Sequence, residues 1–169
     1  MALPLVLVLG VGSQLTVGLL LELTRHDIGA APALTHAAQS LADAEQTLQQ
    51  ASARLAGTLA FPAAGCGAGL CANRQAPPAD SYDWLTGSAH TPLPGLTGAG
   101  YWIESLGTVQ AGQSADCSGS NGGCEYVRLV ASAAAGGIRR SLEACYRIRR
   151  ASNAAPEVTR LSWRQTHAP

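Results

Sequence analysis

The chain has 169 residues, which leaves about 110 for one globular domain once an apolar start and the helix after it are set aside, and this argues against a second domain. Its 11 acidic and 11 basic residues cancel, yet three Arg against eight acids give residues 1–116 a charge of −5, and eight Arg against three acids give residues 117–169 a charge of +5. This asymmetry indicates an orienting dipole between subunits, a basic surface for nucleic acid, or a solvated arginine-rich strand face.

The first predicted element is the uncharged run of residues 1–21. As a helix rising about 1.5 Å per residue it covers roughly 32 Å, close to the thickness of the bilayer's hydrocarbon core. It lacks the basic start of a cleavable signal peptide, and Ala31-Pro32-Ala33, which has the form of a cleavage site, lies far behind it. The pattern therefore favours a lasting anchor over a discarded signal.

An amphipathic helix of about two dozen residues is predicted next. Leucines recur every seven residues, with alanines three after the first three of them, which is a narrow stripe typical of a packed helix. The leucines of this seam are Leu34, Leu41, Leu48 and Leu55. Gly57 and Pro62 are expected to end the helix, and Pro32 to kink it.

Residues 62–100 are rich in Gly, Pro, Ala and Ser without a sustained period, so an irregular surface excursion is expected there. Alternating apolar and polar residues then predict four strands. Their ranges are 101–109, 124–132, 137–148 and 158–165. The order of elements predicts an α+β fold in which a long N-terminal helix, its apolar half projecting, packs on an antiparallel sheet of three or four strands.

Five cysteines follow the apolar segment. Because such a segment would export the chain after it, disulfides are the natural interpretation, with the close pairs Cys66/Cys71 and Cys117/Cys124 as candidates. Cys145 is left over, free or paired between chains. A four-sulfur zinc site is the alternative, although four and six intervening residues exceed the usual spacing within a zinc-binding pair.

At this point the chain resembles the minor pilins of type IV pili, specifically those of the PilX class. The resemblance rests on MALPLVLVLGVGSQLTVGLLLEL leading into an Ala/Glu/Gln-rich helix, on YWIESLG, on EYVRLVASAAAGGIRRSLEACYRI and on the closing RLSWRQ. It implies a pilin fold with an apolar half-helix (1–25), an amphipathic half-helix packing on the sheet (26–59) and a globular domain (60–169).

The resemblance also implies a role. Such a pilin is first anchored in the inner membrane with its C-terminal domain in the periplasm. It then enters the extracellular pilus, where it primes assembly or forms part of the tip complex. Adhesion, twitching motility and DNA uptake are the activities implied. The implied partners are other minor pilins, the major pilin and a PilY-type tip adhesin. Leu5, Leu9, Leu15 and Leu19 would face first lipid and then the filament core.

Processing follows from the same resemblance. Met1 is expected to be the mature, methylated amino terminus, since no leader stands before it. Most pilins carry a glutamate at the fifth mature position, where this chain has Leu5. A buried carboxylate needs a partner, which a terminal subunit lacks on one side. The departure therefore favours a tip or priming subunit over a major pilin.

No catalytic residues, metal ligands or cofactor are expected, because the four histidines are scattered and no nucleophile elbow or phosphate-binding loop occurs. Oxygen-bearing residues in a Gly-rich loop weakly suggest calcium but miss the EF-hand spacing. These residues are Asp116, Ser118, Ser120, Asn121 and Glu125. A DNA contact could be made by Arg139, Arg140, Arg147, Arg149 and Arg150. No aromatic platform for stacking bases can be placed, because the aromatic residues Tyr126, Tyr146 and Trp163 are interpretable as core.

Two other functions remain open. One is the equivalent pseudopilin of a type II secretion system. The other is a single-span envelope binding protein, in which the apolar start would only anchor the domain. Trp84 and Trp102 could contribute to an interface with an adhesin or a neighbouring minor pilin, but burial within the domain is expected for both.

Overall fold

The computed structural model describes residues 31–73, 76, 90–110, 113, 117, 123–150 and 154–166. The chain divides into two units, residues 1–36 and 37–169. The described part of the first unit, residues 31–36, is helical, and in it the Thr35 hydroxyl donates a hydrogen bond to the Ala31 carbonyl at 3.0 Å. Leu34, the first residue of the predicted seam, is 70% exposed there.

The described helix covers residues 31–53 and tightens into a single 3-10 turn, η1 (Arg54–Ala56). It ends at Gly57, whose backbone N–H donates back to the Arg54 carbonyl. The buried side of the helix in the second unit follows the Leu/Ala stripe, because residues three and four apart share one face. Buried in the core are Ala44, Leu48, Ala51 and Leu55, and Leu41 packs partly buried against them.

Two hydroxyl residues also lie on this buried side. Ser40 and Thr47 have no exposed surface, and their hydroxyls donate to the carbonyls of Ala37 and Asp43 one turn earlier. A buried hydroxyl without a partner costs free energy, whereas these two are satisfied inside the helix itself. The helix therefore needs no polar group from the sheet to bury this stripe.

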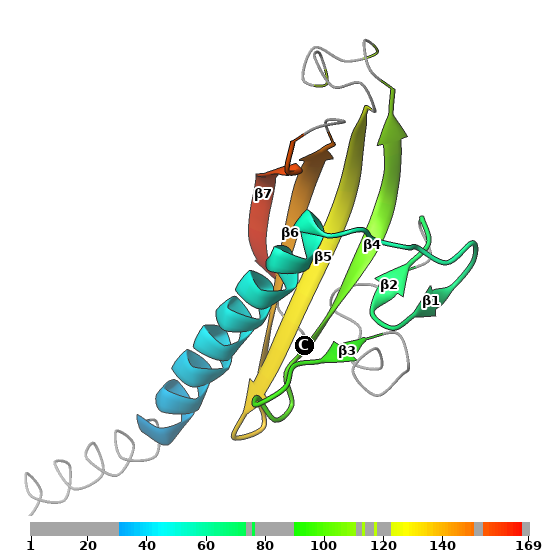
Figure 1. Cartoon of the computed structure of the whole chain (residues 1–169). Coiled ribbons are helices and arrows are strands. Elements are labelled where there is room, and N and C mark those ends of the chain that lie inside the picture. Colours follow the sequence, from blue (N-terminus) through cyan, green and yellow to red (C-terminus); the bar gives the residue numbers. More distant parts are fainter. Residues whose placement is uncertain are drawn as a thin grey trace, which may run out of the picture. The chain divides into compact units, whose positions relative to one another are not determined.

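Seven strands form one mixed sheet in the described part of the chain (Figure 1). They are β1 (Cys66–Gly67), β2 (Leu70–Cys71), β3 (Thr91–Pro92), β4 (Gly100–Val109), β5 (Cys124–Ala135), β6 (Ile138–Arg149) and β7 (Glu157–Thr166). The order is β1-β2-β4-β5-β6-β7, with β3 paired to the start of β4. All pairs are antiparallel except β2 with β4, which is parallel.

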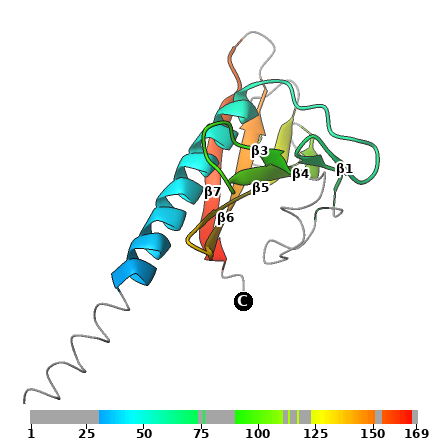
Figure 2. The same cartoon turned by 90° about the horizontal axis from the view of Figure 1, so that it is seen from below.

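The central strands β4, β5 and β6 have buried residues on both faces, and the side-chain alternation sorts these residues between two apolar clusters. The helix lies along one face of the sheet (Figure 2). Ile103, Leu129 and Ala144 are register partners that share a core cluster with the buried helix residues. Trp102 and Val130, one residue away, belong to a second cluster with Cys71 on the opposite face. The main core thus lies between helix and sheet, and a smaller one lies behind the sheet.

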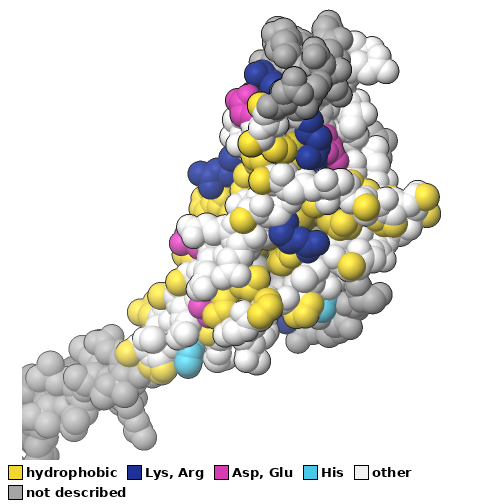
Figure 3. All heavy atoms as spheres, in the orientation of Figure 1, with side chains coloured by type: hydrophobic (Ala, Val, Ile, Leu, Met, Phe, Trp, Pro, Cys, Tyr) yellow, Lys and Arg dark blue, Asp and Glu magenta, His cyan; other side chains and the backbone are white. Residues whose placement is uncertain are grey.

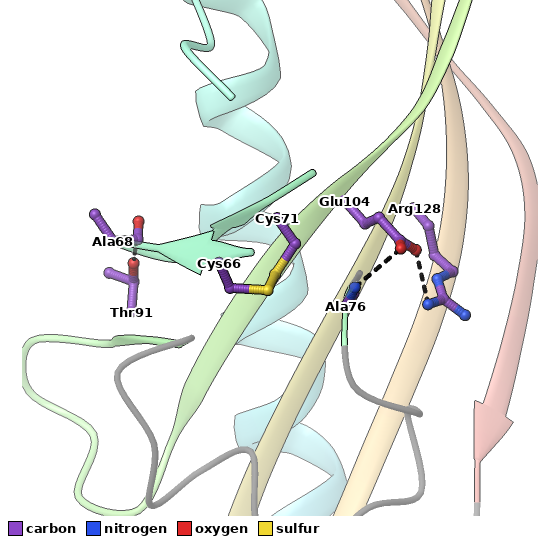
Figure 4. The surroundings of a disulfide bond; sticks show 7 residues. All are labelled: Cys66, Ala68, Cys71, Ala76, Thr91, Glu104 and Arg128. Atoms are coloured by element: carbon purple, nitrogen blue, oxygen red, sulfur yellow. Dashed lines mark hydrogen bonds and ion pairs between the residues drawn. A yellow bond between two sulfur atoms is a disulfide. The ribbon is translucent and has the colours of Figure 1, made fainter. Parts of the chain in front are cut away.

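A hairpin with a two-residue turn extends the sheet beside β4 and contributes Cys71 to that opposite face. Ala68 and Gly69 both have positive φ, as a type I′ turn requires, so β1 and β2 pair directly and the disulfide Cys66–Cys71 links them (Figure 4). A side chain at Gly69 would clash with Thr91, whose hydroxyl donates to the Ala68 carbonyl at 2.9 Å. Glycine is needed here both for the turn and for this close approach.

A buried ion pair lies next to the hairpin. Glu104 is 2% exposed, and its carboxylate accepts from Arg128 at 2.7 Å and from the Ala76 backbone N–H at 3.1 Å (Figure 4). The Arg128 guanidinium also lies over the Trp102 ring, 5.0 Å from its centroid. These contacts tie Ala76, which follows the hairpin in the chain, to the middle of the sheet.

The predicted fold is wrong, although its four long strands lie where the alternation indicates them. The described helix is short, and the sheet has seven strands and is mixed, so the described part of the chain is mostly β rather than a long helix on three or four antiparallel strands. The additional strands have two residues each. Two residues are too few to show a side-chain alternation in the sequence. β1 and β2 are held by backbone pairing and by the disulfide that links them.

Several predictions fall on residues 1–30, which lie outside the described residues. They are the processing of Met1 and the membrane or filament-core positions Leu5, Leu9, Leu15 and Leu19. In the residues that are described, no helix is long and apolar enough to cross a membrane.

Truncating the core between helix and sheet should be costly. Leu129 has no exposed surface, so Leu129→Ala should lower the free energy of unfolding in urea by about 2–5 kcal/mol through lost burial and a residual cavity. Leu106→Ala is the matched control, since Leu106 is 41% exposed and should cost within about 0.5 kcal/mol. Equal losses in the two variants would contradict the two-faced packing.

The Glu104–Arg128 pair gives a second test. Arg128→Ala leaves a buried carboxylate without its cation and should destabilise by about 3 kcal/mol. Arg150→Ala, which removes a more exposed pair with Glu125, should cost at most about 1 kcal/mol. Adding Glu104→Gln to Arg128→Ala should recover part of the loss in urea unfolding. If Arg128→Ala lowers the free energy of unfolding no more than Arg150→Ala does, the buried pair stabilises the fold no more than the exposed one.

Candidate binding groove between the helix and the edge strand

An open groove runs between the helix and β7. It has a volume of about 400 Å3 and is lined on one side by the helix and on the other by the strand. Its lining residues are Glu45, Leu48, Gln49, Arg160 and Trp163. On the side of the molecule drawn in Figure 3, exposed hydrophobic side chains lie beside arginine and acidic side chains. We call this feature the helix–β7 groove.

The helix supplies one wall because residues three and four apart project from the same side. Glu45, Leu48 and Gln49 have this spacing. Leu48 is 4% exposed and joins the groove to the main core, whereas Glu45 and Gln49 are exposed to solvent. The wall is therefore apolar at its base and polar at its rim.

A β-bulge makes the other wall. In β7, Ser162 pairs with Cys145 and Arg160 pairs with Tyr146, so Leu161 is an extra residue without a partner in β6. Regular alternation would place residues three apart on opposite faces, but one extra residue between them restores a common face. Arg160 and Trp163 consequently line the same groove.

The groove carries an aromatic surface that is only half covered. Trp163 is 47% exposed and Leu161 is 50% exposed, although tryptophan and leucine usually bury most of their area. Trp163 was interpretable as core from the sequence, and the structure places it at the surface instead. β7 is the last strand of the sheet, with β6 as its only neighbour in the strand order.

Tyr146 holds Arg160 in place from the next strand. Its hydroxyl makes side-chain hydrogen bonds with Arg160 on β7 and with Ser52 on the helix, so one phenol links both sides of the groove. Burial raises the pKa of Tyr146 above its ordinary value of 10.0, and the nearby Arg160 charge and both hydrogen bonds oppose that rise in part. Tyr146 is thus neutral at physiological pH and acts as a fixed positioning group.

The arrangement is suited to binding. It offers an apolar base, an exposed indole face, a carboxylate and a guanidinium, all accessible from solvent. In the described residues, no three His, Cys, Asp or Glu side chains are grouped closely enough to hold a metal ion. A segment that brings an apolar side chain flanked by charged groups fits this chemistry.

The predicted seam residues are distributed unevenly. Leu48 and Leu55 are buried in the core, Leu41 is partly buried, and Leu34 is exposed in the other unit. Of the four, only Leu48 reaches the helix–β7 groove.

The predicted cysteine pairs are both disulfides in the structure, Cys66–Cys71 and Cys117–Cys124, and Cys145 carries a free thiol. Both disulfides lie outside the groove lining. The bonded sulfurs leave no thiolate for the alternative zinc site. The oxygen-bearing loop weighed for calcium lies outside the described residues except for Glu125, which pairs with Arg150 at 3.4 Å.

Many arginines of the basic half are engaged with glutamates. The pairs are Arg128–Glu104, Arg149–Glu157, Arg150–Glu125 and Arg164–Glu143, with separations of 2.7 to 3.4 Å. They neutralise part of the positive charge on which a nucleic-acid surface would depend. A DNA contact therefore stays a prediction without added support.

Sequence reasoning missed Arg160 and Trp163 as site residues. A period of two predicts Arg160 and Trp163 on opposite faces of the strand, whereas the bulge puts them on the same face. The only sequence signal was an arginine-flanked tryptophan in a terminal strand, and that pattern is equally typical of a core residue.

Replacing Tyr146 by Phe should reveal its role. The variant loses the bonds to Ser52 and Arg160 and should be less stable by about 0.5–1.5 kcal/mol at pH 7. Because the folded-state pKa lies above that of the unfolded chain, the contribution of Tyr146 is complete below pH 10.0 and is lost as pH rises beyond it. Stability measured by urea unfolding should consequently fall less steeply above pH 10.0 in Tyr146→Phe than in the parent. Identical slopes would contradict this burial.

The chain was compared with protein-family models, with curated proteins and with solved structures, and none of the three comparisons finds a match. The function is therefore argued from the chain's own residues.

Proposed function

We propose that this chain is a non-enzymatic minor pilin of a type IV pilus, which primes assembly or forms part of the tip complex. The observation that carries the proposal is the order of its parts: an uncharged stretch of residues 1–21, then a Leu/Ala-striped helix, then a disulfide-bonded sheet domain. The proposal rests on this order and on the quoted sequence resemblance, and it does not use the fold that the structure corrects.

The cysteine chemistry supports an exported domain. Two disulfides in one small domain are typical of an oxidising compartment such as the periplasm or the cell surface. We accordingly place the chain in the inner membrane with its C-terminal domain in the periplasm, and then in the extracellular pilus.

The described surface supports a role in assembly. The helix buries one stripe against the sheet, while Glu45 and Gln49 on its rim and Trp163 on β7 remain accessible to another chain. The proposed partners are other minor pilins, the major pilin and a PilY-type tip adhesin. Adhesion, twitching motility and DNA uptake are the cellular activities that such a complex would serve.

A single-span envelope binding protein is the second candidate. The helix–β7 groove favours it, because a domain with an open apolar groove can bind a partner without entering a filament. A minor pseudopilin of a type II secretion system would use the same parts in a different machine.

Removing the apolar segment separates these functions. A strain whose only copy lacks residues 1–25, exported instead by a cleavable signal peptide, should make a soluble periplasmic domain that never reaches sheared pili. The full-length chain expressed at the same level is the control, and should be detected in sheared pili by immunoblot.

Each contrary outcome has a meaning. Normal pili that contain the truncated form would overturn the pilin role. Full-length chain that stays in the membrane fraction and never shears off with pili would favour the envelope binding protein. Loss of hydrolase secretion with normal pili would favour the pseudopilin.

A further inference from the structure

The outer edge of β7 is long and bears large apolar side chains. β7 has ten residues and one neighbouring strand, and Leu161 and Trp163 are each about half exposed. A strand at the end of a sheet offers backbone groups for pairing, and most proteins protect such an edge by shortening it or by adding charges. β7 is one of the longer strands of this sheet, so its edge is a candidate pairing surface.

The groove beside this edge holds two opposite charges that do not pair with each other. Glu45 lies on the helix wall and Arg160 on the strand wall, and no ion pair links either of them to another described residue. The Arg160 guanidinium is hydrogen-bonded to the neutral phenol of Tyr146, which leaves its charge uncompensated. An occupant of the groove therefore gains most if it supplies both a base for Glu45 and an acid for Arg160.

A second copy of the same surface meets this requirement through symmetry. In a twofold contact every pairing between the copies occurs twice, so a contact that sets Glu45 of one copy against Arg160 of the other forms that opposite-charge pair two times. Antiparallel strand pairing has the same twofold symmetry, so two β7 strands can extend one sheet across the axis. The chain has no formal net charge, which means that long-range repulsion between copies does not oppose the contact.

We propose that two copies of this chain associate through β7 and the helix–β7 groove, as a twofold dimer in which Glu45 of each copy pairs with Arg160 of the other. The contact also covers Trp163 and Leu161, which are otherwise exposed to water. The inference does not depend on the pilin role, because it concerns only the sheet domain and the helix that packs on it.

Charge reversal in complementary pairs gives the decisive test. The full-length chain in detergent is measured by sedimentation equilibrium at up to roughly 100 µM, a concentration that saturates a micromolar contact. The parent should dimerise, whereas Glu45→Arg alone and Arg160→Glu alone should each weaken dimerisation at least about tenfold, because each sets like charges against each other twice.

The mixture of the two variants distinguishes this contact from any other. A Glu45→Arg chain and an Arg160→Glu chain together restore both opposite-charge pairs, so heterodimers in an equimolar mixture should form about as tightly as the parent dimer and at least about tenfold more tightly than either variant alone. Circular dichroism checks that both variants are folded. A monomeric parent, or dimers unchanged by either substitution, would overturn the proposal.

Cross-linking tests the contact without altering either charge. In a Cys145→Ser background, Leu161→Cys on β7 should cross-link between copies with a short bismaleimide at least about tenfold faster than Leu106→Cys on β4. The two leucines are matched, at 50% and 41% exposure. Equal rates at the two positions would overturn the proposal. A parent that is monomeric in sedimentation but still appears in pili would leave the proposed function standing and remove only this dimer.

Discussion

The register of the three central strands is the constraint on which the rest of the structure depends. Ile103, Leu129 and Ala144 lie in one row across β4, β5 and β6, facing the helix, and the next row holds Glu104, Arg128 and Cys145 on the other face. A slip of one residue in any strand would exchange the two rows. It would put a buried carboxylate against the Leu/Ala stripe of the helix, and this is the physical reason that the pairing is unique.

The two faces of the sheet are held by different means. The helix face is closed mainly by apolar packing, since Ser40 and Thr47 satisfy their own hydroxyls within the helix, and Arg54 adds a hydrogen bond to the Tyr101 hydroxyl at 2.6 Å. On the opposite face, the disulfide-linked hairpin beside β4 contributes Cys71 to the small cluster, and the Glu104 carboxylate of the Glu104–Arg128 pair also binds the backbone at Ala76. The disulfide and the hydrogen bond from Ala76 to Glu104 hold the hairpin and the chain after it, which contribute few apolar residues to the core.

The sequence predicted the elements in which a side-chain pattern repeats several times. It did not predict the two-residue strands or the single bulge. The heptad stripe located Leu48 and Leu55 in the core, and alternation located all four long strands. The strands of two residues escaped because they have no period, and the edge groove escaped because one unpaired residue, Leu161, reverses the faces on which its neighbours appear. Both the two-residue strands and the groove depend on how the backbone pairs, and the pattern of apolar and polar side chains does not reveal that pairing.

The bulge at Leu161 shows that a change in the length of β7 can alter the surface of the sheet without altering its core. Inserting or removing one residue in an outermost strand exchanges which side chains it shows to each face, while β4, β5 and β6 keep their pairing. Related chains could therefore acquire different recognition surfaces at this rim through a single codon, with the interior left as it is.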